Sequence, residues 1–161
     1  MDDETKRRVL RQIPYGMFVM TATHAGTIAA STLTWISQCS FHPPLVMIGV
    51  QSNSATHAVI EASGALAVHF LAEDQQEIAQ KFFRPPEDGG DGRLHGLRYE
   101  PGPETGSPIL VDLPAWLEAR VLDRVARGDH TVYVCEVVEA GSRRSDFAPL
   151  LLANTPWSYG G

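Results

Sequence analysis

Hydrophobic positions along the chain follow two periods, one typical of strands and one typical of helices. Apolar or alternating segments predict strands at 17–23, 28–39, 45–50, 65–71, 109–111, 115–125, 131–138 and 150–153. Apolar residues spaced three to four apart predict helices at 2–12, 55–63 and 73–83. The segment 84–108 is rich in Pro and Gly, which predicts a surface loop with at most a short strand at 97–99.

Several short strands with only two or three helices, and no regular βαβ alternation, predict an all-β fold with peripheral helices. Closure into an antiparallel Greek-key barrel is expected because it removes exposed strand edges. Neither a repeat nor a composition break divides the sequence, so residues 1–161 are expected to form a single domain. Alternation in the strand at 115–125 predicts that Leu117 faces one side and that Glu118 and Arg120 face the other.

Composition narrows the class of protein. The net charge of −6 has no basic stripe against it, so no nucleic-acid partner is expected. The N-terminus has no apolar signal segment and the longest apolar run is short, so no membrane association is expected. The two cysteines, Cys39 and Cys135, are predicted to be buried free thiols rather than a disulfide, which favours a cytoplasmic protein.

The segment 31–45 is the most informative for chemistry. It contains five hydroxyl side chains within ten residues, followed by the pair Pro43–Pro44 and a buried strand. Hydroxyls that alternate with Leu, Trp and Ile would suit a flat heterocycle needing hydrogen bonds at its edge and apolar contact on its face. From residue chemistry alone, an ordinary strand with one solvated face is the simpler interpretation.

Three further segments each leave two interpretations open. Small polar residues at 51–57, before a helix, predict either an anion site or a plain helix cap. At the end of the helix at 73–83, Lys81 and Arg84 could meet a phosphate or complement the helix dipole. His130, in a Gly-Asp-His turn, could touch a bound ring or simply be exposed.

Other kinds of site lack their motifs. The sequence contains no dinucleotide-binding G-x-G-x-x-G after a strand, no P-loop and no G-x-S-x-G nucleophile elbow. It has no C-x-x-C and no closely spaced histidine pair, so no metal site is expected. Chemistry carried by a bound organic cofactor is the interpretation that remains.

Taken in order, these segments resemble the flavin reductase-like family, whose members have an FMN-binding split β-barrel. The resemblance rests on a Ser/Thr strand, S-x-x-P-P-L at 40–45, S-x-T at 54–56, A-x-x-F at 79–82 and G-D-H at 128–130. It covers roughly residues 12 to 160. The stretch 35–38 also resembles the reductase-like domain of diflavin proteins.

The resemblance implies a set of site residues. The ring would be lined by Ser31, Thr32, Leu33, Thr34 and Trp35, with Ser40 belonging to the S-x-x-P-P-L motif. The ribityl chain and phosphate would be served by Gln51, Ser52, Asn53, Ser54 and Thr56. Phe83 and Arg84 would close the site, and His130 would act beside the ring or the incoming nicotinamide. Because 51–57 contains no Lys or Arg, Arg84 is the candidate cation for the phosphate.

The resemblance also implies an activity. The expected protein is a homodimeric oxidoreductase that binds FMN, with FAD less expected, and passes electrons from NAD(P)H to free flavin, oxygen or a redox partner protein. Two alternatives stay open: an electron-transfer flavoprotein with a protein donor, and a non-catalytic member that only binds a ligand.

Overall fold

A single curved antiparallel sheet of seven strands dominates the fold. The computed structural model describes residues 1–87 and 90–161. The strands lie in the order β2-β1-β5-β9-β10-β4-β3. They are β1 (Phe18–His24), β2 (Thr27–Leu33), β3 (Ile36–Ser40), β4 (Leu45–Gln51), β5 (Ala65–Phe70), β9 (Ala115–Ala126) and β10 (His130–Ser142). The prediction of an all-β fold with few helices is confirmed, and β1, β4, β5, β9 and β10 were each expected within a few residues. The single strand predicted at 28–39 is instead two strands, β2 and β3.

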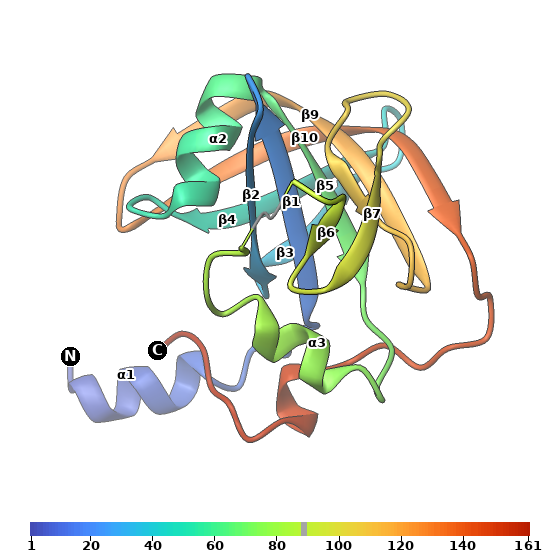
Figure 1. The fold of residues 1–161 in the computed structure, drawn as a ribbon. Coiled ribbons are helices and arrows are strands. Elements are labelled where there is room, and N and C mark those ends of the chain that lie inside the picture. The colour runs from blue at the N-terminus through green and yellow to red at the C-terminus, as the bar shows by residue number, and fades with distance from the viewer. Residues whose placement is uncertain (88–89) are drawn as a thin grey trace.

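The connection between β2 and β3 explains the curvature. These strands form the two edges of the sheet, yet only Thr34 and Trp35 separate them in the chain. The sheet must therefore curl until its two edges approach each other, as Figure 1 shows. The link is fixed by the Gly49 N–H, which donates to the Trp35 carbonyl at 2.8 Å.

Three helices lie outside the sheet: α1 (Asp3–Leu10), α2 (Ala55–Ser63) and α3 (Gln76–Lys81). Helix α2 packs against β1 and β2 through Val59 and Ile60, whereas α1 has no buried residue and lies beside the C-terminus (Figure 1). Helix α3 is shorter than the predicted 73–83. The Glu73 N–H donates instead to the Ala148 carbonyl, and the Gln75 side chain accepts from the Ala72 N–H.

The segment predicted to be a surface loop with at most a short strand at 97–99 supplies two strands of a second, three-stranded sheet, and the strand predicted at 109–111 supplies the third. This sheet consists of β6 (Arg93–Leu94), β7 (Leu97–Pro101) and β8 (Pro108–Leu110). Its Leu94 and Leu110 are fully buried against the outer face of β1. Strands β1 and β5 are therefore buried on both faces, with one core inside the curved sheet and another beneath the small sheet and α3.

The predicted last strand at 150–153 is wrong. Leu151 makes one isolated bridge with Gly16, and a short 3₁₀ helix, η1 (Leu152–Asn154), follows. Leu150 and Leu152 instead turn into the second core, where η1 ends at a hydrogen bond from the Thr155 hydroxyl to the Leu152 carbonyl.

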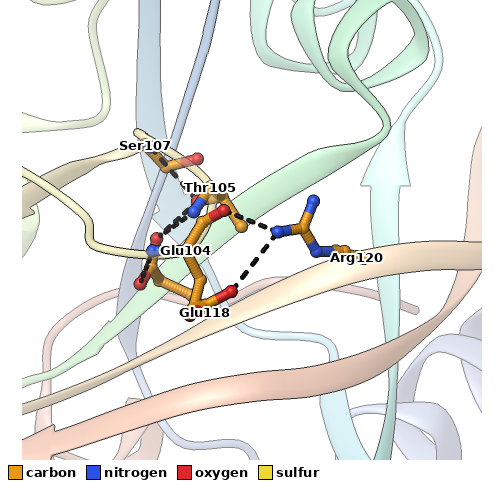
Figure 2. A network of polar contacts seen from close by, with 5 residues as sticks. All are labelled: Glu104, Thr105, Ser107, Glu118 and Arg120. Atoms are coloured by element: carbon orange, nitrogen blue, oxygen red, sulfur yellow. Dashed lines mark hydrogen bonds and ion pairs between the residues drawn. The ribbon is translucent and has the colours of Figure 1, made fainter.

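Glu118 lies on the same face of β9 as Arg120, as predicted, and both side chains contact Glu104. Alternation places it with Arg120 on the outer face of β9, and Arg120 is indeed exposed. Glu118, however, is completely buried because residues 102–107 cover it (Figure 2). Its carboxylate accepts hydrogen bonds from the Glu104 N–H at 3.1 Å and from the N–H and hydroxyl of Thr105 at 2.8 and 2.6 Å.

The two cysteines differ in their surroundings. Both are free thiols, as predicted, and Cys135 is buried in the core of the sheet, where burial raises its pKa to about 12. Cys39 is exposed, contrary to the prediction, because it lies in an irregular part of the edge strand β3, between Gln38 and Ser40.

Candidate functional site

A cavity of about 750 Å³ lies along β2, between the start of α2, the segment after α3 and the C-terminal residues. Ten of the residues predicted for the site line it: Ser31, Thr32, Leu33, Thr34, Gln51, Asn53, Ser54, Thr56, Phe83 and Arg84. The structure thus brings together four segments that are far apart in the sequence.

Strand β2 provides the floor of the cavity. Ala29 and Ala30 are buried and small, which leaves space above the strand. The Ser31 hydroxyl lies 3.0 Å from the Thr56 hydroxyl, and the Thr32 hydroxyl donates to the Ala79 carbonyl at 2.6 Å. Since a hydroxyl has one proton and two lone pairs, these bonds fix both side chains and leave acceptor capacity beside the cavity.

The start of α2 forms one end of the cavity. Ser54 is its N-cap and accepts from the His57 N–H at 3.1 Å, so the cap predicted as the simpler alternative is present. Asn53, Ala55 and Thr56 line the cavity around it. N–H groups of the first helical turn have no acceptor within the helix, and the helix dipole favours negative charge there. This end of the cavity is suited to an anion.

The segment after α3 places a basic side chain in the cavity wall. Arg84 lines the cavity, and its guanidinium makes no ion pair or hydrogen bond within the described residues. Lys81 does not line the cavity; its ammonium donates instead to the His95 carbonyl at 3.4 Å. Of the two basic residues considered from the sequence, only Arg84 is placed to meet a ligand.

Four predicted residues lie outside the cavity wall: Trp35, Ser40, Ser52 and His130. Ser40 lies at the other end of β3, paired with Leu45. The Ser52 N–H donates to the Asp129 carbonyl at 2.9 Å, which joins the loop before α2 to the turn before β10.

Trp35 and His130 form a separate group on the outer side of β4 and β10. Their ring centroids are 4.4 Å apart. Gly49 makes room for the indole, because a Cβ there would lie 3.0 Å from the Trp35 ring. The Trp35 Nε1 is buried and has no hydrogen-bond partner in the described part of the chain.

The wall that the sequence did not predict is the C-terminal strap, residues 157–160. Trp157, Ser158 and Tyr159 line the cavity. The Trp157 ring packs edge-on against Phe83, at 4.7 Å between centroids. The only local signal is the aromatic content of the sequence W-S-Y, which has no periodicity to locate it.

The C-terminal strap is connected to the Trp35–His130 group by hydrogen bonds. The Tyr159 hydroxyl lies 2.7 Å from His130 Nε2, and His130 Nδ1 lies 2.8 Å from the Asp129 carboxylate. The hydrogen bond from His130 lowers the pKa of Asp129, and burial raises the pKa of Tyr159. Asp129 is therefore a carboxylate and Tyr159 a neutral phenol at neutral pH.

Comparison with known proteins decides the family. The model of the flavin reductase like domain matches residues 10–158. The chain belongs to the flavin reductase like family. Its similarity to an NADH:FMN oxidoreductase of Rhodococcus qingshengii is 31% identity over 148 residues, which are 90% of this chain and 75% of that protein. It is also 27% identical to diflavin flavoprotein A 1 of Synechocystis sp., over 84% of this chain and 23% of that protein.

Solved structures of flavin reductase like proteins have the same fold. A flavin reductase domain protein from Arthrobacter sp. superposes with a TM-score of 0.80 at 29% identity, over 93% of this chain and 90% of that one. An NADH:FAD oxidoreductase of Streptomyces globisporus, in complex with NAD and FAD fragments, has a TM-score of 0.75 at 27% identity, over 86% of this chain and 81% of that one.

Within residues 1–87 and 90–161, no group of three or more His, Cys, Asp or Glu side chains is arranged to hold a metal ion. No described helix is both long enough and apolar enough to cross a membrane.

Proposed function

We propose that this protein is a flavin reductase that binds FMN in the cavity along β2 and reduces it with NAD(P)H. The observation that carries the proposal is the distribution of apolar and polar groups along the wall of that cavity. Apolar side chains such as Met17 and Met20 line it together with the hydroxyls of β2, and its anion-binding elements are a helix start and Arg84. A flavin mononucleotide has the same division, with a flat ring system and a dianionic phosphate.

The size of the cavity fits this ligand. Its 750 Å³ lies within the range of about 300–1,000 Å³ found for small-molecule sites. The hydroxyls of Ser31, Thr32 and Thr34 would meet the polar edge of the ring, and Ala29 and Leu33 would contact its apolar parts. Small residues on β2 are required because a larger side chain would occupy the space of the ring.

The phosphate would be held at the start of α2. Asn53, Ser54 and Thr56 offer side-chain groups there, and the helix offers N–H groups. The whole chain carries a net charge of −6, so a dianion needs a local positive charge. Arg84, which also lines the cavity, would supply it.

Bound FMN would supply the redox chemistry, accepting a hydride from the nicotinamide. The contribution of the chain is to position the two rings and to exclude water, because hydride transfer depends on orientation rather than on a protein acid–base pair. The comparisons support the donor class: the Rhodococcus relative is named for NADH, and the Streptomyces structure contains NAD and FAD fragments.

The proposed assembly is a homodimer with the flavin near the interface. The outer faces of β4, β9 and β10 expose Met47, Val125 and Val132, each 38–50% accessible. Val132 lies directly opposite Val125 in the register, and Met47 opposite Val134, so these side chains share one face. Such a surface is unusual for a monomer and supports a second copy of the chain as its partner.

Sedimentation at micromolar concentration tests this assembly. The expected mass is about twice the 17.6 kDa of one chain. If the protein is a monomer and still binds flavin with undiminished affinity, the flavin site does not lie at a subunit interface.

Two further expectations belong to the proposal. A single domain over 1–161 is supported by the two cores, which share strands β1 and β5. A cytoplasmic location is supported by Cys39 and Cys135, both of which are free thiols.

The deciding experiment is the visible spectrum of the purified protein with FMN, before and after NADH is added under anaerobic conditions. We expect FMN to bind below about 100 µM, equivalent to roughly −5.5 kcal/mol, and its absorbance to bleach with NADH or NADPH. Binding without bleaching would favour a flavoprotein with another electron donor. If neither FMN nor FAD binds, the proposal is wrong.

A further inference from the structure

Three side chains form a continuous hydrogen-bonded chain from the turn before β10 to the C-terminal strap. The Asp129 carboxylate lies 2.8 Å from His130 Nδ1, and His130 Nε2 lies 2.7 Å from the Tyr159 hydroxyl. Packing supports the arrangement, because the Trp35 ring contacts both His130 and Tyr159, at centroid distances of 4.4 and 5.2 Å.

The direction of each hydrogen bond follows from the Asp129 carboxylate. A carboxylate can only accept, so Nδ1 of His130 carries the proton that it donates to Asp129. In the neutral ring, Nε2 is then an acceptor, and the Tyr159 hydroxyl donates to it. The raised pKa of Tyr159 agrees with a phenol that retains its proton. The phenol oxygen keeps its lone pairs for a second partner, which must be a donor.

The two ends of this chain differ in their access to ligands. Tyr159 lines the main cavity and also a smaller one of about 250 Å³ on the other side of the C-terminal strap. His130 lines neither cavity. Tyr159 is 40% exposed, so it lies at the solvent edge of the cavity, where a second ring would arrive after flavin has bound.

We propose that Tyr159, rather than His130, contacts the nicotinamide, accepting a hydrogen bond from its carboxamide N–H, and that His130 is the positioning residue behind it. This inference rests on the proposed function. An oriented acceptor selects a ring that carries an amide, because an analogue without the N–H leaves the phenol oxygen unpaired. His130 contributes by holding the phenol proton, which would otherwise be free to turn toward the ligand.

The C-terminal strap has few other polar anchors in this region. The Arg11 guanidinium Nε donates to the Gly160 carbonyl at 3.1 Å. Gly160 lies beside the Trp35 indole and the Tyr15 ring lies 6.4 Å from it between centroids, but neither accepts from the indole Nε1. The hydrogen bond from Tyr159 to His130, together with the packing of Tyr159 on Trp35, therefore holds Tyr159 beside the cavity.

The test is equilibrium binding of two oxidised nucleotides to the FMN-loaded protein. NAD+ carries the carboxamide, whereas 3-acetylpyridine adenine dinucleotide has an acetyl group in its place and no N–H. We expect the wild type to bind NAD+ about tenfold more tightly, equivalent to one hydrogen bond of about 1.4 kcal/mol. Tyr159→Phe should reduce this preference to within twofold.

Tyr15→Phe is the matched control, since Tyr15 also lies beside Trp35, with ring centroids 6.4 Å apart, and its hydroxyl is not bonded to His130. It should keep the tenfold preference. A Tyr159→Phe protein that discriminates as well as Tyr15→Phe would overturn the inference.

The positioning role of His130 is read separately from ring-nitrogen NMR spectra of the flavin-free protein. We expect the Nδ1–H tautomer in the wild type and in Tyr15→Phe, and a larger Nε2–H population in Tyr159→Phe. An Nε2–H wild type would overturn the role. Neither measurement needs hydride transfer, so a protein that discriminates but never bleaches would contradict the proposed function and leave this inference standing.

Discussion

Polar side chains, threonine hydroxyls among them, occur both on the floor of the cavity and in the β8 corner, but their hydrogen bonding differs. We define the β8 corner as residues 102–110 with Glu118 and His69. In the corner, Figure 2 shows the Glu118 carboxylate occupied by donors from Glu104 and Thr105, while Arg120 donates to the Glu104 carbonyl at 2.6 Å. On β2, the hydroxyls are bonded once each and face open space.

The difference lies in what fills the remaining volume. In the corner the protein fills it: a Cβ on Gly102 would collide with the Glu118 carboxylate, so only Gly allows the close approach. On β2 the alanines and small hydroxyl residues leave it empty. Polar groups that are satisfied internally stabilise the fold, and those left with spare lone pairs beside a cavity are available to a ligand. Variants in the two regions should therefore affect different measurements.

The largest effect on stability is expected for Glu118→Ala. It leaves three donors from residues 104–105 without an acceptor and opens a cavity, which should lower the free energy of unfolding by about 3–5 kcal/mol. Urea unfolding measures the change. Glu73→Ala, at an exposed site, is the control and should shift stability by less than about 0.5 kcal/mol. An equal shift in both variants would show that the corner is not a rigid element.

The next effect is a dependence of stability on pH through His69. Burial lowers its pKa from 6.5 to about 4, and the neutral ring donates to the Val19 carbonyl and accepts from the Leu110 N–H. As pH falls below 6.5, the unfolded chain binds the proton first, so stability declines until the folded state also protonates near pH 4. The loss should reach about 3 kcal/mol.

Urea unfolding between pH 7 and 4 measures this dependence, with His69→Gln as the comparison. The difference between wild type and variant should shrink as pH falls. A difference that stays constant over this range would mean that His69 is not held neutral.

The third effect should appear in ligand affinity and not in stability. Arg84→Ala removes the charge proposed to meet the phosphate, and charge-assisted hydrogen bonds contribute about 1.5–3 kcal/mol. FMN should bind roughly tenfold to a hundredfold more weakly. Riboflavin, which has no phosphate, should lose little.

Fluorescence titration of both ligands measures the effect, with Arg144→Ala as a control for net charge at an exposed residue remote from the cavity wall. Equal losses for FMN and riboflavin would remove Arg84 from the phosphate site.

The smallest effect is expected for Ser31→Ala. It deletes one hydroxyl pair, with Thr56, and should cost about 1 kcal/mol of stability or less. FMN affinity should fall a few-fold if the hydroxyl also meets the ring. Adding Thr56→Val should recover part of the stability, because no unpaired hydroxyl remains, and should not recover the affinity. If both the stability and the FMN affinity recover, the Ser31–Thr56 pair is only a structural contact.

Apart from the division of 28–39 into two strands, the sequence predicted the first half of the fold well because its signals are local. The apolar runs at 45–50 and 65–71 fall on β4 and β5, and α2 begins and ends as predicted, with Ser54 as its cap and Gly64 in a left-handed conformation at φ 66°. The Ser/Thr strand and the 51–57 loop were placed together by the order of motifs. The chain folds them onto one cavity.

What the sequence did not predict concerns residues whose environment is set by distant segments. Alternation in β9 predicts the face on which Glu118 lies but not its burial, which depends on Gly102 and Thr105, more than ten positions away. The cavity-facing position of Tyr159 depends on a hydrogen bond to His130, 29 residues earlier, and no periodicity in the C-terminal strap reports it. Local patterns carry no information about which distant segments cover a residue.

The position of β10 between β9 and β4 also determines the order in which parts of the sheet can form during synthesis. Residues 45–51 pair with 130–136, so the strand that carries Gly49 and Gln51 gains this neighbour only after some eighty intervening residues. A nascent chain that ends before β10 can form hairpins such as β1–β2 and β3–β4, but not the completed wall behind the cavity. Closing so long a loop is slow, which places folding in the range of milliseconds to seconds typical of non-local β topologies. Flavin capture during synthesis should therefore wait until β10 has emerged from the ribosome.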